Sequence, residues 1–234
     1  MGSKTATADL ETENLVALMK KQLLSFRDFL KTGSLGPISP DMTMAEIVEV
    51  LGTPEHVDPD YWTFGKLEIS FDITPPRQMN WFQIEQASYL KGDLEALTTR
   101  FAVSLDGFSG KTKPSEFLGA GLWTPDQAKV FYATSGHDIG MNICAGPIQI
   151  HFHVAADFIG NQDAETYLNV SSPSQSMAKI DSQAVLDSIY SYPYPKTEEV
   201  PGAFNWKLLS GSQYLALADG QQTSANKKGA RRPL

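Results

Sequence analysis

Two stretches of the chain alternate between apolar and polar residues, the pattern expected of a strand that buries one face. Residues 79–86 follow the first stretch after a proline-rich turn and predict its antiparallel partner, with Phe82 and Ile84 toward the core. Residues 166–171 predict a partner strand for the second stretch. The apolar positions are Leu67, Ile69, Phe71 and Ile73 in the first stretch, and Ile148, Ile150, Phe152 and Val154 in the second.

Other parts of the chain show helical spacing. Apolar residues recur every three or four positions between residues 10 and 32, which predicts a long N-terminal helix ended by Gly33. A second helix is expected after Thr43, because the Thr43 hydroxyl and the Glu46 carboxylate have the spacing of a capping box. Residues 93–103 and 182–190 are also expected to be helical.

The two alternating stretches match each other along the chain. Leu67 falls on Ile148 under a shift of 81 positions, and the same shift places Thr43 on Thr124, which begins a second capping-box pattern. We therefore predict an internal duplication of a helix–strand unit. The alternative is that two unrelated helix–strand units have similar capping and turn residues.

These elements predict an α+β protein made of tandem helix-plus-antiparallel-sheet units with an N-terminal helix. The pattern also allows one continuous curved sheet across both units. The expected divisions are an N-terminal segment and helix (1–35), a first unit (36–100), a second unit (101–185), a C-terminal extension (186–220) and a disordered tail (221–234).

Charge narrows the classes of partner. The chain has a formal net charge of −8, which argues against nucleic acid because phosphate binding needs a basic surface. The same acidity suits a basic protein that is attracted electrostatically. The single cysteine, Cys144, favours a reducing, cytoplasmic location. We expect neither a signal peptide nor membrane insertion, because no apolar run reaches the roughly 18 residues of a membrane helix.

His151 and His153 lie two residues apart on the second alternating stretch, opposite its apolar positions. Two imidazoles on one strand face can bind a metal ion, but further ligands are needed and no residue stands at motif spacing. We therefore expect no metal and no other cofactor, and interpret the pair as part of a polar outer face. The alternative is a metal-dependent or hydrolytic enzyme that uses His151 and His153.

The segment GPISPDMTMAEIVEVLGTP (36–54), with the strand residues Leu67-Glu68-Ile69 after it, resembles the helix–sheet unit of the BamE-like (SmpA/OmlA) group. Beta-lactamase inhibitor protein is similar as a tandem pair of such units, and so are uncharacterised bacterial cytosolic proteins of the immunity type. The resemblance implies the tandem fold and binding to another protein. This chain lacks the lipoprotein signal of the outer-membrane members and the disulfides of the secreted inhibitor, which argues against those two roles.

The predicted function is protein binding, most concretely as an immunity-type inhibitor that neutralises a bacterial toxin by binding a basic toxin domain. The outer sheet face is expected to make the contact, because interfaces combine aromatic anchors with a charged rim. For Trp62 and Trp81 the alternative is a place in the core. No catalytic residue is predicted. The predicted partner-binding residues are Tyr61, Trp62, Glu68, Asp72, Trp81 and Glu85.

Overall fold

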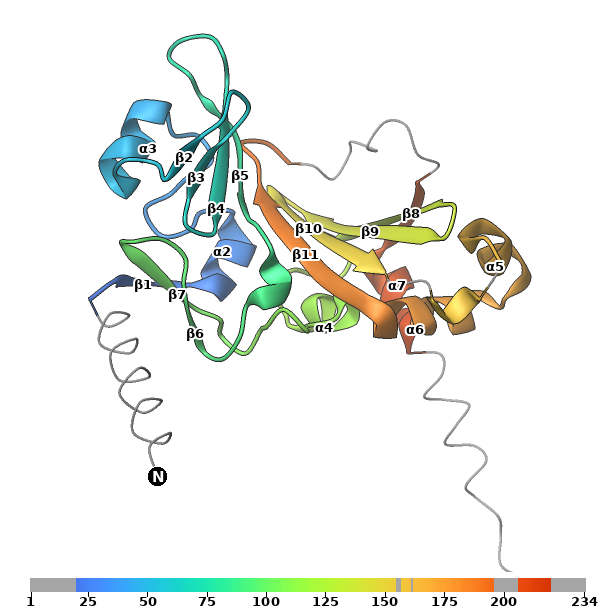
Figure 1. The fold of residues 1–234 in the computed structure, drawn as a ribbon. Helices are drawn as coiled ribbons and strands as arrows, with labels where there is room; N and C mark the ends of the chain where they lie inside the picture. The colour runs from blue at the N-terminus through green and yellow to red at the C-terminus, as the bar shows by residue number, and fades with distance from the viewer. Residues whose placement is uncertain (1–19, 155–156, 161, 196–205, 220–234) are drawn as a thin grey trace, which may run out of the picture.

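The computed structural model describes residues 20–154, 157–160, 162–195 and 206–219. Its main feature is an antiparallel sheet of nine strands (Figure 1). Both predicted alternating stretches, β4 and β10, belong to this one sheet, and the α+β class is confirmed. The order across the sheet is β12 (Lys207–Ser210), β8 (Lys129–Ser135), β9 (Asp138–Ala145), β10 (Ile148–Val154), β11 (Ala184–Ser191), β5 (Met79–Ile84), β4 (Leu67–Phe71), β3 (Trp62–Phe64) and β2 (His56–Val57).

A smaller sheet contains the start of the described chain. Its three strands are ordered β1 (Gln22–Ser25), β7 (Phe101–Ser104) and β6 (Leu94–Ala96), with β1 parallel to β7. Helix α2 (Phe26–Thr32) follows β1 directly, because the Ser25 hydroxyl accepts from the Asp28 amide at 3.1 Å and caps the helix there. The predicted long N-terminal helix is therefore wrong over residues 22–25, and its residues 10–19 lie outside the described residues.

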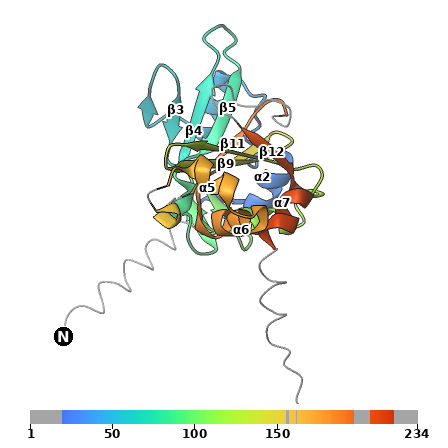
Figure 2. The same cartoon turned by 90° about the vertical axis from the view of Figure 1, so that its right-hand side faces the viewer.

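Helix α3 (Met44–Leu51) forms where its capping box predicted it. The Glu46 amide donates to the Thr43 hydroxyl at 3.4 Å, and the Thr43 amide donates to the Glu46 carboxylate at 2.8 Å. This helix lies beside the β2–β5 end of the sheet, whereas α5–α7 gather at the other end (Figures 1 and 2). The remaining helices are α4 (Pro114–Gly119), α5 (Ala164–Val170), α6 (Pro173–Gln183), α7 (Gly211–Ala218) and the short 3₁₀ turns η1 (Ala87–Tyr89) and η2 (Asp157–Ile159).

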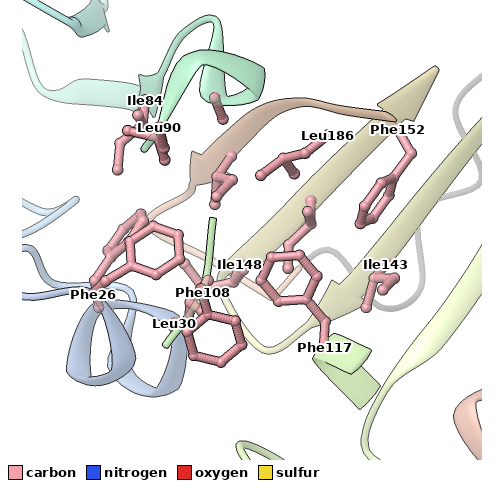
Figure 3. Close-up of a cluster of buried hydrophobic side chains, with 14 of the residues drawn as sticks. Phe26, Leu30, Ile84, Leu90, Phe108, Phe117, Ile143, Ile148, Phe152 and Leu186 are labelled. Atoms are coloured by element: carbon pink, nitrogen blue, oxygen red, sulfur yellow. The ribbon is translucent and has the colours of Figure 1, made fainter. Parts of the chain in front are cut away.

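The main core lies between the large sheet and helices α2 and α4 (Figure 3). Phe82 and Ile84 are fully buried there, as predicted, and so are the four apolar positions of β10. Aromatic rings join the layers, because Phe117 of α4 lies 5.1 Å from Phe108 and 5.9 Å from Phe152, measured between ring centroids. The opposite side of the large sheet, which carries the alternate residues of each strand, is called the outer face below.

Three predicted elements are wrong, and in two of them strand pairing overrides the local helical spacing. Residues 93–103 form β6 and β7 rather than a helix, and residues 184–190 form most of β11. In β11 the pairing with β10 shifts between His151 and Phe152, which leaves Asp187 as an extra residue. Because of this extra residue, the sequence of β11 does not alternate regularly between apolar and polar residues. Residues 166–171 fall on α5 and its end instead of forming a strand.

The predicted duplication also fails. The segment from Thr124 to Gln127 keeps part of the capping pattern, with the Thr124 amide donating to the Gln127 side chain at 2.9 Å, but it forms a turn that leads directly into β8. The helix that a second unit requires is therefore missing at this place. Ile73, predicted in the core, lies beyond the end of β4 and is 86% exposed.

Candidate functional site

A row of polar side chains crosses four strands on the outer face. Gln149 of β10 pairs with Tyr190 of β11, Tyr190 pairs with Gln83 of β5, and Gln83 pairs with Glu68 of β4. Because side chains alternate along a strand, all four point away from the apolar core. Gln83 is only 5% exposed and donates from its amide nitrogen to the Glu68 carboxylate. The row therefore brings distant parts of the chain to one place.

Aromatic rings gather around this row. The Trp81 ring meets the Tyr190 ring edge-on at 5.3 Å, and Tyr190 stacks on Tyr192 at 5.8 Å. Tyr192 in turn lies 6.2 Å from Tyr194, which is 46% exposed. Trp81, Tyr190 and Tyr192 are half-buried. Such rings combine a large apolar surface with a polar tip, the property that enriches them in interfaces.

Three carboxylates lie close enough to Tyr190 that their charges, after the larger effect of burial, help to raise its pKa: Glu68, Asp187 and Glu85. Glu85 follows β5, and Asp187 is the extra residue of β11. Burial raises the pKa of the Glu85 carboxyl, and a hydrogen bond with Glu68 and the charges of Glu68 and Asp187 raise it further. Within the described parts of the chain, the ion pair between Lys66 and Glu95 is the only one, so none of the three carboxylates is neutralised by a cation there.

The two histidines of β10 lie in different surroundings. The His151 ring is 4.7 Å from Tyr190, and its Nε2 is buried without a hydrogen-bond partner among the described residues. Burial lowers the pKa of His151 to about 4, against the opposing effect of the Asp187 charge. His153 is exposed and lines a separate hollow of about 260 Å³ beside Trp206. The described residues contain no group of three or more His, Cys, Asp or Glu side chains placed for a metal ion.

The structure divides the six predicted partner-binding residues between two neighbouring surfaces. Glu68, Trp81 and Glu85 lie on the outer face, and Tyr61 is close enough that the Glu68 charge is the main cause of its raised pKa. Trp62 instead pairs with Ile69 and packs on Phe71 at 5.4 Å, on the side of helix α3. We call the first surface the acidic–aromatic face and define it by Tyr61, Glu68, Trp81, Glu85, Asp187 and Tyr190.

The second surface is a hollow of about 460 Å³ at the β2–β5 end of the sheet, which we call the distal hollow. Trp62 and Asp72 line it, and Tyr61 lines it as well, so Tyr61 connects the hollow with the acidic–aromatic face. Of the six predicted residues, Asp72 is exposed and the other five are half-buried.

The sequence analysis missed Gln83, Asp187 and Tyr190. A signal for Tyr190 exists, because tyrosines at 190, 192 and 194 alternate as they do on one face of a strand. Because residues 182–190 were expected to be helical, this alternation of tyrosines was not recognised as a strand pattern. Asp187 carries no such signal, since its place depends on the irregular pairing of β11 with β10.

Comparison of the chain with protein-family models, with curated proteins and with solved structures finds no match. None of the described helices combines the length and the apolar character that crossing a bilayer requires.

Proposed function

We propose that this protein binds a basic protein through its acidic–aromatic face. Most concretely, it is an immunity-type inhibitor that neutralises a bacterial toxin in the cytoplasm. One observation carries the proposal: three carboxylates without a cation partner among the described residues act on Tyr190, whose half-buried ring meets that of Trp81.

A cationic partner resolves an electrostatic conflict within this face. Burial is the largest cause of the raised pKa of Glu85, and the negative charges of Glu68 and Asp187 add to it by repulsion. A lysine or arginine of a partner placed among them replaces that repulsion by attraction. Trp81 and Tyr190 supply the apolar contact area, and aromatic residues of this kind are common among the few that dominate binding energy. The narrower identification as a toxin inhibitor is supported by the resemblance of α3 and β4 to immunity-type proteins.

The enzymatic alternative has one observation in its favour. The buried Nε2 of His151 has no described hydrogen-bond partner, and its lowered pKa keeps the ring neutral at pH 7, as a general base requires. However, His153 lies in a different environment, beside Trp206. A mechanism that uses both histidines on one substrate therefore has less support than protein binding.

The proposal is tested by capture and then by measured affinity. The immobilised protein is used to capture partners from its source organism, and a captured protein is identified, purified and titrated against the wild type and variants. Trp81→Ala is expected to weaken binding by more than about ten-fold, as loss of a central aromatic anchor does. Val170→Ala is the matched control, because Val170 is 71% exposed on α5 at the other end of the sheet.

Two results would contradict the proposal. One is a captured partner that carries no basic surface. The other is equal affinity of the wild type and Trp81→Ala for the captured partner. Turnover of a small substrate that is lost in His151→Gln would support the enzymatic alternative instead.

A further inference from the structure

The distal hollow has an apolar, aromatic floor. Trp62 and Phe71 meet edge-on at 5.4 Å between ring centroids, and Met44 of α3 lines the same hollow. Both rings are only half-buried, so part of each ring face remains accessible to a ligand. A volume of about 460 Å³ falls within the range of small-ligand pockets, and is large enough for a single large side chain.

The rim of the distal hollow is acidic. Asp58 and Asp60 stand on the turn between β2 and β3, where the Asp60 amide donates to the Asp58 carboxylate at 3.2 Å and fixes the turn. Asp72 stands on the opposite rim, just beyond β4. The pKa of Tyr61 is raised, mainly by the charge of Glu68 and next by that of Asp58, which shows how negative this region is.

One cation lines the hollow, and it does not neutralise the rim. The Arg77 guanidinium donates to the Met44 sulfur at 3.7 Å and forms no ion pair within the described residues. Three aspartates against one arginine leave the lining with a formal charge of −2.

Exposed apolar side chains flank the same opening. Val57 is 63% exposed and Ile73 is 86% exposed, and both line the hollow. Val57 ends β2 and Ile73 follows β4, so the two side chains come from the neighbouring hairpins β2–β3 and β4–β5. Large apolar side chains exposed in pairs beside a cavity are typical of interaction sites.

We propose that the distal hollow receives an arginine side chain of the protein partner, with the residues next to that arginine packing on Val57 and Ile73. This inference rests on the proposed function and names the contact that fits the hollow. Charge complementarity selects a cation, and the aromatic floor selects a flat one. A guanidinium stacks on Trp62 while donating two parallel hydrogen bonds to an aspartate, which the compact ammonium of lysine cannot do.

The binding chemistry is testable without the partner. The probe is Nα-acetyl-arginine methylamide, and its matched control is Nα-acetyl-citrulline methylamide, which has nearly the same shape but no charge. Each is titrated into the full-length protein while the Trp62 indole N–H signal is followed by NMR, assigned with Trp62→Phe. The arginine probe is expected to give a saturable shift, and citrulline at least about ten-fold weaker binding.

Variants of the rim are expected to change this affinity in opposite directions. Asp60→Asn and Asp72→Asn should each weaken arginine binding by about two- to five-fold, the usual effect of an exposed ion pair. Arg77→Gln should tighten it, because the like charge beside the hollow is removed. Asp93→Asn is the control, since Asp93 is exposed in another part of the molecule and leaves the hollow unchanged.

Equal shifts with arginine and citrulline, or weaker binding in Arg77→Gln, would overturn the inference. The proposed function has a separate readout, namely partner affinity in Trp81→Ala, which does not line the hollow. Intact partner binding without an arginine-specific shift therefore refutes only the use of the hollow. An arginine-specific shift together with unchanged partner affinity in Trp81→Ala refutes the acidic–aromatic face instead.

Discussion

At the scale of single residues, His151 lies in an environment unlike that of an ordinary surface histidine. It lies beside Tyr190 with its Nε2 buried and without a described hydrogen-bond partner, and its pKa falls to about 4. In the unfolded chain a histidine has a pKa near about 6.5. As the pH falls from about 6.5 to about 4, the unfolded state therefore binds a proton that the folded state does not.

We expect His151 to make the protein less stable in mild acid. The free energy of unfolding should be fully retained above about pH 6.5 and should fall by about 3 kcal/mol by about pH 4, with no further loss from this group below. His151→Gln should lose most of this dependence, whereas His153→Gln, exposed on the same strand, should keep it. Urea unfolding at several pH values measures the effect. A wild-type slope retained in His151→Gln would show that this histidine is not buried in neutral form.

The titration of Glu85 changes stability in the direction opposite to that of His151. Burial and its acidic neighbours raise its pKa, so the folded state holds this proton more tightly than the unfolded state does. Stability is therefore lost as the pH rises from the unfolded pKa of about 4.5 through the raised folded value. Glu85→Gln should be more stable than the wild type at pH 7 and equal to it at pH 3, whereas Glu55→Gln on the exposed surface should differ at neither. A Glu85→Gln variant that is less stable at pH 7 would contradict this arrangement.

At the scale of elements, one carboxylate holds three helices together. Asp181 of α6 accepts from the Tyr214 hydroxyl of α7 at 2.9 Å, and from the amide and hydroxyl of Ser115 of α4 at 2.9 and 2.8 Å. Tyr214 is fully buried, so its hydroxyl cannot bond to water instead.

We expect Tyr214→Phe to lower the free energy of unfolding by about 1.5–3 kcal/mol, the range for a hydrogen bond to a charged group. Tyr167→Phe, at a half-buried position on α5, should cost under about 1 kcal/mol. Chemical denaturation of both variants at one pH compares them directly. Equal stability of Tyr214→Phe and the wild type would show that Asp181 is satisfied without Tyr214.

Local signals predicted those elements that depend on local interactions. The hydrogen bonds of Thr43 and Glu46 join residues three apart, and they define the start of α3 in the sequence and in the structure. The strands β1 and β7 pair residues that are far apart in the chain, such as Leu24 with Val103, and no local pattern specifies that partner. Two of the six residues of the acidic–aromatic face, Tyr190 and Asp187, were missed for the same reason, because they reach it only through the pairing of β11 with β5 and β10.

At the scale of the whole molecule, the two ends of the nine-stranded sheet carry different surfaces. The α5–α7 end is covered by helices, whereas α3 lies beside the β2–β5 end (Figure 1). The distal hollow opens at the β2–β5 end, and the acidic–aromatic face extends from there across β4 and β5 to β11. A net charge of −8 attracts any basic protein at long range. Docking through the acidic–aromatic face, by contrast, requires that loss of the Glu68 and Asp187 charges slows association more than loss of two charges elsewhere.

The most direct test is therefore the association rate of the captured partner with two charge-matched double variants. One variant removes two charges from the acidic–aromatic face, Glu68→Gln with Asp187→Asn. The other removes two at the far end, Glu165→Gln with Asp219→Asn, where both side chains are exposed. Rates are measured by stopped flow at low and high salt, because exposed charges are screened beyond about 8 Å at physiological ionic strength.

We expect the first variant to associate several-fold more slowly than the second at low salt, with the difference disappearing at high salt. Equal association rates for the two variants at low salt would contradict the central claim, because only the total charge and not the acidic–aromatic face would then guide the partner.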